Sequence, residues 1–259
     1  MKLNLYLKQR GIITGPLSKR KNTSHSRLDV ILKYLTNREQ FHGGEGFLYF
    51  GSALHSLSLE GGTKLLQSVN IALPDRKRIM LMAAKLETNP VWKKLMLGAI
   101  CELKKKTSLN GVRVSYILDI LQKKLRRGAD LKTTVCKTLE EFVQSAIDYG
   151  YFRQGETYKA AEKLKDFIFV GIQKVPPHNI YILDVSLYPE ETKYAIQELE
   201  FLLYFYDNYG NVLKGGIDLR NKFATDNENH LMDAVRYLTP GIIKEKPTTG
   251  FFRKRRWKI

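Results

Sequence analysis

Two acidic residues and a lysine stand out because their types and spacing suit the hydrolysis of a phosphodiester bond. Asp119 lies near the end of the apolar segment SYILDILQ, and Asp130 and Lys132 follow in the segment ADLKTT. A carboxylate among hydrophobic neighbours is costly to bury unless it serves a cation or another ligand. Two carboxylates that hold a divalent metal ion, with one lysine that stabilises developing negative charge, can cleave phosphodiesters.

These side chains must be positioned by neighbouring strands. In a β-strand, residues i and i+2 project from the same face, so Asp130 and Lys132 point together while Leu131 packs behind them. If the strand that carries Asp119 pairs with this one through a tight turn, both acids reach the same edge of the sheet. The spacing alone is a weak signal, because Asp and Lys are common at solvent-facing strand ends, and an ordinary charged strand end remains the alternative.

The surrounding pattern predicts an α/β fold with a central mixed β-sheet flanked by helices. Strands are predicted at 100–107, 112–121, 129–133, 166–174 and 179–188, and Asn110-Gly111 is a hairpin turn between the first two. Helices are predicted at 26–35, 47–59, 138–149, 152–165, 190–206 and 229–237, and from Pro74 towards Asn89. Thr138 and Glu141 form a capping box at one helix start.

The chain divides into three predicted parts. Residues 1–45 are a basic, partly helical extension, residues 46–206 form the core, and residues 207–259 form a second extension that ends in a basic and aromatic tail. The tail mixes cations with aromatic rings, which suits contacts with a nucleic-acid backbone and stacking on bases. Its candidate DNA-binding residues are Arg253, Arg255, Arg256 and Trp257. A solubilising tail or an oligomer contact is the equal alternative.

Charge and composition narrow the class of partner. The net charge is +17 with a pI near 9.7, which predicts a polyanionic partner without separating DNA from RNA or an anionic membrane surface. No segment approaches the roughly 20 apolar residues of a membrane span, and no signal peptide is recognisable, so a cytoplasmic protein without membrane contact is expected. The two cysteines, Cys101 and Cys136, cannot supply the four thiolates of an iron–sulfur cluster.

Several segments taken together resemble a known family. FGSALHSL, Glu102, Asp119, ADLKTT and QGETY occur in the order seen in RecB-like nucleases of the PD-(D/E)xK superfamily. The stretch ADLKTTVCKTLEEFVQSAIDYGYFRQGETYKAA is most similar to the RecE (exonuclease VIII) type carried by phages and prophages. The resemblance covers roughly residues 45–205. It implies a restriction-endonuclease-like core and a phage or prophage origin in a bacterial host.

The resemblance also implies a metal site. Asp119 and Asp130 would be the metal-binding acids, with the Leu131 carbonyl as a further ligand for Mg²⁺ or Mn²⁺. His55 and Glu102 would complete or adjust this site. Taken without the resemblance, the histidine is more simply a satisfied core or surface residue, and the glutamate an ordinary cross-strand ion-pair partner.

The resemblance further implies an activity and its partners. Lys132 would be the catalytic lysine, and Gln154 and Tyr158 would position the DNA strand. Members of the family degrade double-stranded DNA ends in recombination, which makes further copies of the chain and a single-strand annealing recombinase expected partners. An endonuclease of the same superfamily and a non-catalytic DNA-binding accessory protein with the same fold remain the alternatives.

Overall fold

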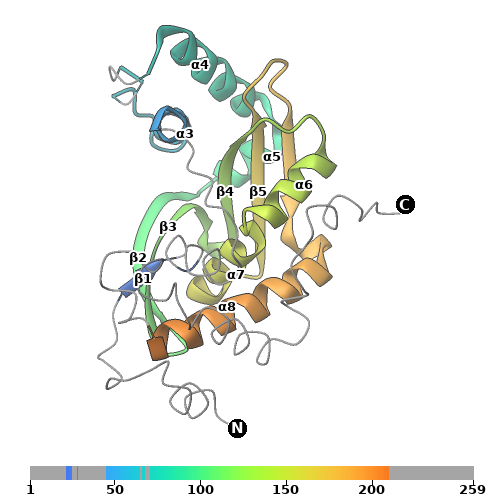
Figure 1. Ribbon diagram of the computed structural model, residues 1–259. Coiled ribbons are helices and arrows are strands. Elements are labelled where there is room, and N and C mark those ends of the chain that lie inside the picture. The colour runs from blue at the N-terminus through green and yellow to red at the C-terminus, as the bar shows by residue number, and fades with distance from the viewer. Residues whose placement is uncertain (1–21, 25–27, 29–44, 65, 68–70, 210–259) are drawn as a thin grey trace, which may run out of the picture.

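The computed structural model describes residues 22–24, 28, 45–64, 66–67 and 71–209 (Figure 1). Its helices are α3 (Glu45–Glu60), α4 (Leu73–Thr88), α5 (Pro90–Met96), α6 (Leu139–Asp148), α7 (Tyr151–Glu162) and α8 (Pro189–Tyr209). Its strands are β1 (Asn22–Ser24), β2 (Ile100–Leu109), β3 (Val112–Gln122), β4 (Arg127–Thr134), β5 (Asp166–Gln173) and β6 (Ile180–Asp184). The helix predicted at 229–237 and nearly all of 26–35 and of the two extensions lie outside these residues. None of the described helices is long and apolar enough to cross a membrane.

The six strands form one mixed sheet, and the sequence predicted a mixed sheet with five of them. Strand β3 pairs antiparallel with β2 and β4 and parallel with the short β1, which the sequence did not predict. Strand β4 pairs parallel with β5, and β5 pairs antiparallel with β6. The parallel pair is connected through α6 and α7, which cover one face, because a parallel return needs a long crossover.

Helices pack on both faces of the sheet and enclose two hydrophobic cores. Helices α3, α4 and α5 contribute buried residues such as Trp92 to one core, and α6 and α7 contribute residues such as Phe142 to the other. Figure 1 shows α3 and α4 on one side of the strands and α7 and α8 on the other. Strand β5 lies between the two cores and sends Ile168 and Val170 to the first and Phe167 and Phe169 to the second. A strand buried on both faces explains the continuous apolar run in this segment.

Local side-chain hydrogen bonds explain where helices begin. Thr138 Oγ1 accepts a hydrogen bond from the Glu141 N–H at 3.2 Å, as the capping box predicted, whereas the Glu141 carboxylate accepts from the Lys137 N–H at 2.7 Å. Helix α5 was not predicted. It begins because Asn89 Oδ1 accepts hydrogen bonds from the N–H groups of Val91 and Trp92, at 2.9 and 3.0 Å.

Two predicted elements end earlier than the sequence suggested. The strand predicted at 179–188 stops at Asp184, whose Oδ1 accepts hydrogen bonds from the Ser186 N–H at 2.9 Å and hydroxyl at 2.7 Å. These bonds turn the chain into a short 3₁₀ helix, Val185–Leu187. The helix predicted at 152–165 ends at Glu162, because Lys163 takes the left-handed conformation with φ 54°.

Gly171 on β5 offers a test of the packing between sheet and helices. A Cβ atom there would lie 2.6–2.9 Å from ring atoms of Phe142, whose fully buried ring is also stacked on Tyr181. We expect Gly171→Ala to lower the free energy of unfolding by about 1–3 kcal/mol, measured by urea denaturation. Gly51→Ala on α3, where a Cβ would meet nothing within 4 Å, should be neutral or stabilising. Equal stability of the two variants would contradict this packing.

Candidate active site

Strands β3 and β4 separate where the predicted acids lie. Their ladder ends at the pair Ile120 and Ala129, and one step further along the same register Asp119 stands opposite Asp130. In place of a backbone bond across this gap, the Leu131 N–H donates to Asp119 Oδ2 at 2.8 Å. Both acids are buried, with exposed fractions of 6% and 2%. The structure therefore brings the two acids together at the edge where the strands part.

Strand β2 is distorted beside the same point. Glu102 has a positive φ of 50°, and the β2–β3 ladder has pairs on either side of Glu102 and Asp119 but none between these two residues. Cys101 and Leu103, two residues apart, pack against opposite cores, although alternation would place them on one face. The alternation of side chains between the two faces of the sheet is therefore interrupted at Glu102. A left-handed glutamate costs roughly 1–3 kcal/mol and is typical of functional sites.

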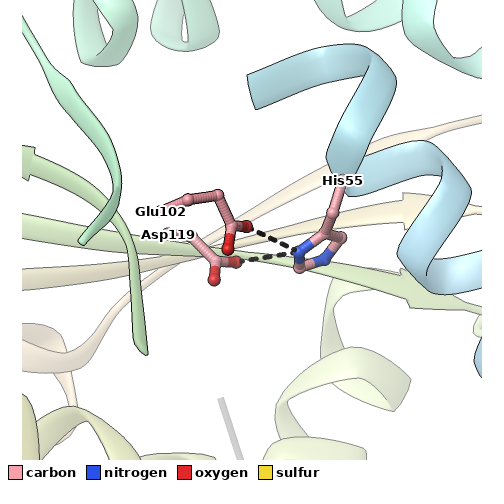
Figure 2. Close-up of side chains that lie close together, drawn as sticks. All are labelled: His55, Glu102 and Asp119. Carbon is pink, nitrogen blue, oxygen red and sulfur yellow. Dashed lines mark ion pairs between the residues drawn. The ribbon is translucent and has the colours of Figure 1, made fainter. Parts of the chain in front are cut away.

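His55 on α3 faces both carboxylates. Its Nδ1 atom lies 3.7 Å from Glu102 Oε1 and 3.5 Å from Asp119 Oδ2, and Figure 2 shows the imidazole pointing from the helix towards the two acids. The other ring nitrogen, Nε2, lies 2.7 Å from the Leu131 carbonyl oxygen. A carbonyl only accepts hydrogen bonds, so Nε2 carries the proton in this contact. In the neutral ring the lone pair is then on Nδ1 and faces the acids, as a metal ligand requires.

The three side chains fit a metal ion. One ligand atom from each of His55, Glu102 and Asp119 lies within 4.8 Å of the other two. An imidazole nitrogen with two carboxylate oxygens is a donor set that divalent cations accept. The Leu131 carbonyl, expected as a ligand, instead holds the imidazole of His55 in this structure. Its contact with a metal ion stays a prediction.

Asp130 takes part in a second network on the α7 side. Lys132 Nζ lies 2.6 Å from Asp130 Oδ1, and Gln154 Nε2 donates to Asp130 Oδ2 at 3.0 Å. The same Gln154 nitrogen donates to the Tyr158 hydroxyl at 3.0 Å, and that hydroxyl donates to the Ile117 carbonyl at 2.7 Å. Ile117 lies on β3 between the residues paired with β1 and those paired with β4. Gln154 and Tyr158 therefore bridge the gap between the separating strands, and a direct role in DNA binding stays a prediction.

The proximity of these charges shifts their pKa values. Burial alone would lower the pKa of His55, but the carboxylates of Glu102, Asp119 and Asp130 outweigh it and raise that pKa to about 9. Burial, followed by repulsion from Asp130, raises the pKa of Asp119 to about 7. Burial would also lower the pKa of Lys132, but the negative charge of Asp130 raises it above its usual range. Lys132 therefore remains an ammonium at neutral pH.

These shifts predict that metal affinity depends on pH. A proton competes with the metal ion at each ligand below the pKa of that ligand. The apparent dissociation constant should therefore fall as the pH rises through about 7 for Asp119 and about 9 for His55, and level off above. Titration calorimetry with Mn²⁺ in buffers of different ionisation enthalpy should show protons released on binding. Constant affinity between pH 6 and 9 would contradict the shared site.

Aromatic residues near Lys132 were not predicted from the sequence. The Lys132 Nζ atom lies 5.0 Å from the ring centroid of Tyr151, and Tyr149 is stacked on Tyr151. The aromatic pair around Gly150, directly before the predicted Gln154 helix, is the signal that could have identified them. The predicted tail residues Arg253, Arg255, Arg256 and Trp257 lie outside the described residues.

Comparisons with known proteins leave the family undecided. No family model and no curated protein matches the sequence. Among solved structures, a chain from Eubacterium rectale named "Putative exonuclease" is 15% identical, with a TM-score of 0.48 over 69% of this chain and 73% of its own. A chain named SSO0001 is 12% identical, with a TM-score of 0.34 over 93% of this chain and 96% of its own. At these values neither similarity establishes a family or a function.

Proposed function

We propose that this chain is a metal-dependent deoxyribonuclease with a restriction-endonuclease-like core of the PD-(D/E)xK superfamily. The observation that supports the proposal best is the convergence of two groups at one strand edge. His55, Glu102 and Asp119 form a group that fits a metal ion, and beside it Lys132 is paired with Asp130. Cation ligands next to a permanently charged lysine are suited to a phosphodiester, whose negative charge must be neutralised during hydrolysis.

The side chains can divide the work of hydrolysis. When bound, Mg²⁺ or Mn²⁺ would neutralise a phosphate oxygen and activate a water molecule. Lys132 can donate hydrogen bonds to the phosphate oxygens as their charge develops, and Asp130 and Gln154 hold that end of the site in place. Magnesium prefers oxygen ligands, so the nitrogen of His55 favours Mn²⁺ over Mg²⁺ in this group.

Unpaired basic side chains near the acids support a nucleic-acid substrate. Lys123 and Lys124 lie on the turn that joins β3 to β4 and are exposed. Within the part of the chain that the structure describes, neither forms an ion pair, whereas lysines elsewhere do, such as Lys105 with Glu162. The turn begins four residues after Asp119, which is roughly 13 Å along an extended strand. With a net charge of +17, a polyanion bound at the acids would also meet these lysines.

The resemblance to RecE-type nucleases supports a more specific substrate. The preferred substrate is then double-stranded DNA, degraded from its ends during phage-type recombination in a bacterial cell. The expected partners are further copies of the chain and a single-strand annealing recombinase. The ordered motifs ADLKTT and QGETY support this choice over other members of the superfamily.

The decisive experiment compares linear with covalently closed circular duplex of the same sequence. With Mn²⁺ or Mg²⁺, the chain should degrade the linear DNA and leave the circle intact, and loss of a 5′ or a 3′ label should report the polarity. EDTA should stop the reaction. Cutting of the circle would indicate an endonuclease. Salt-sensitive binding that is indifferent to EDTA, without any cleavage, would indicate a non-catalytic DNA-binding protein.

A further inference from the structure

Three aromatic rings lead from the core, past Lys132, to the surface. The buried ring of Phe169 on β5 is stacked on Tyr151, with centroids 5.3 Å apart and planes 23° apart. Tyr151 is in turn stacked on Tyr149, with centroids 6.1 Å apart and planes 24° apart. The Lys132 ammonium lies 5.0 Å from the Tyr151 centroid. The inner rings therefore contact the lysine, while 44% of Tyr149 remains exposed.

The backbone between α6 and α7 fixes this arrangement. Gly150 separates the two tyrosines and has a positive φ of 68°. The Tyr149 N–H donates to the Ser145 carbonyl at 2.9 Å, which ends α6 with a hydrogen bond. A Cβ atom at Gly150 would lie 2.5 Å from a guanidinium nitrogen of the buried Arg153. Because this turn is closely packed and suits glycine, it holds both rings in a defined orientation.

We propose that Tyr149 is a stacking platform for a nucleobase of the DNA strand that binds at Lys132. The inference rests on the proposed function and names the part of the substrate that the site recognises. An aromatic side chain stacks on any base, because every base has a π-face. The path from the Lys132 ammonium to the Tyr149 ring consists of 5.0 Å to the Tyr151 centroid and 6.1 Å from there to the Tyr149 centroid. This is comparable to about three base-pair spacings of duplex DNA, at roughly 3.4 Å each. A phosphate held by Lys132 can thus have its own base, or that of a near neighbour, at this ring.

The platform favours the end of a DNA strand. Inside a duplex both faces of each base are already covered by neighbouring bases, so an internal base must be unstacked at a cost of a few kcal/mol. A terminal base has one face open. The exposed Tyr149, stacked on the ring that contacts the lysine, is therefore better matched to the last base of a strand than to the interior of a closed circle.

Fluorescence of a DNA duplex with 2-aminopurine as its terminal base tests the proposal. Asp130→Asn is the parent variant in this assay, because it should leave the DNA uncut during the measurement. Stacking should quench the probe when the parent binds. The quench should persist with Tyr149→Phe added and disappear with Tyr149→Ala or Tyr149→Leu added. Tyr194→Ala is the matched control, because Tyr194 on α8 is 42% exposed and lies outside the proposed site.

Steady-state kinetics with the active chain supply a second readout. Tyr149→Ala should raise KM for short linear duplexes about 5- to 150-fold, the range expected for loss of one stacked base, with a smaller change in kcat. Tyr149→Phe should restore the original KM. Unchanged quench and KM in both Tyr149→Ala and Tyr149→Leu would overturn the platform, as would equal defects in these variants and Tyr149→Phe. If the unsubstituted chain released no nucleotides, the result would contradict the proposed nuclease activity and not the stacking role of Tyr149.

Discussion

Asp119→Asn is expected to weaken metal binding and to remove nearly all DNA cleavage while the fold is retained. Asparagine keeps an oxygen that can accept the hydrogen bond which the Leu131 N–H donates at 2.8 Å, so the gap between β3 and β4 stays bridged. It removes the negative charge from the group formed with His55 and Glu102. Loss of several kcal/mol of electrostatic stabilisation in the transition state corresponds to a rate reduction of about two to four orders of magnitude.

Calorimetric titration with Mn²⁺ and cleavage of end-labelled linear duplex measure these two effects. Asp166→Asn is the matched control, because Asp166 lies on β5 with its carboxylate 3.4 Å from Arg127 and a side chain that is 39% exposed. This control should bind metal and cut DNA as the unsubstituted chain does. The unfolding free energy of Asp119→Asn should fall by no more than about 1 kcal/mol, since the backbone hydrogen bond survives and the charge that is removed is disfavoured by burial and by Asp130. Normal cleavage by Asp119→Asn would refute the site.

Lys132→Met should separate metal binding from catalysis. Methionine keeps most of the apolar stem of the side chain but removes the ammonium, which lies 2.6 Å from Asp130 Oδ1 and 5.0 Å from the Tyr151 ring centroid. The group of His55, Glu102 and Asp119 does not include this lysine, and losing a nearby positive charge cannot weaken its attraction for a cation. Metal affinity should therefore be equal or higher, whereas cleavage should fall by about 10²–10³-fold, as for loss of one donor that stabilises developing charge.

The comparison of the two variants is more informative than either alone. Under identical conditions Asp119→Asn should be impaired in both assays and Lys132→Met only in the cleavage assay. Lys85→Met, on an exposed part of α4, should pass both. If Lys132→Met also lost the metal ion, the lysine would act through the structure of the site. If it cut DNA normally, the proposed role in charge stabilisation would be wrong.

The sequence already contained much of the fold and part of the site. Apolar segments bounded by turn residues located β2 to β6, and Thr138 and Asn110-Gly111 marked a helix start and a hairpin, because these signals act over a few residues. The i, i+2 spacing placed Asp130 and Lys132 on one strand face, where the structure shows them in contact. The gathering of His55 and Glu102 with Asp119 followed from the family resemblance alone, since no local pattern links an α-helix to two distant strands.

Only the tertiary structure decided how these side chains are used. Glu102 has a positive φ because Cys101 and Leu103, on either side of it in β2, pack against different hydrophobic cores. The strands part beyond Ile120, and Asp119, Gln154 and Tyr158 supply hydrogen bonds in place of the missing ladder. Residue types and spacing determine which groups exist and which strand face they share. The distances between groups far apart in the chain depend on strand bending and helix docking, which arise from contacts among many residues that no short segment encodes.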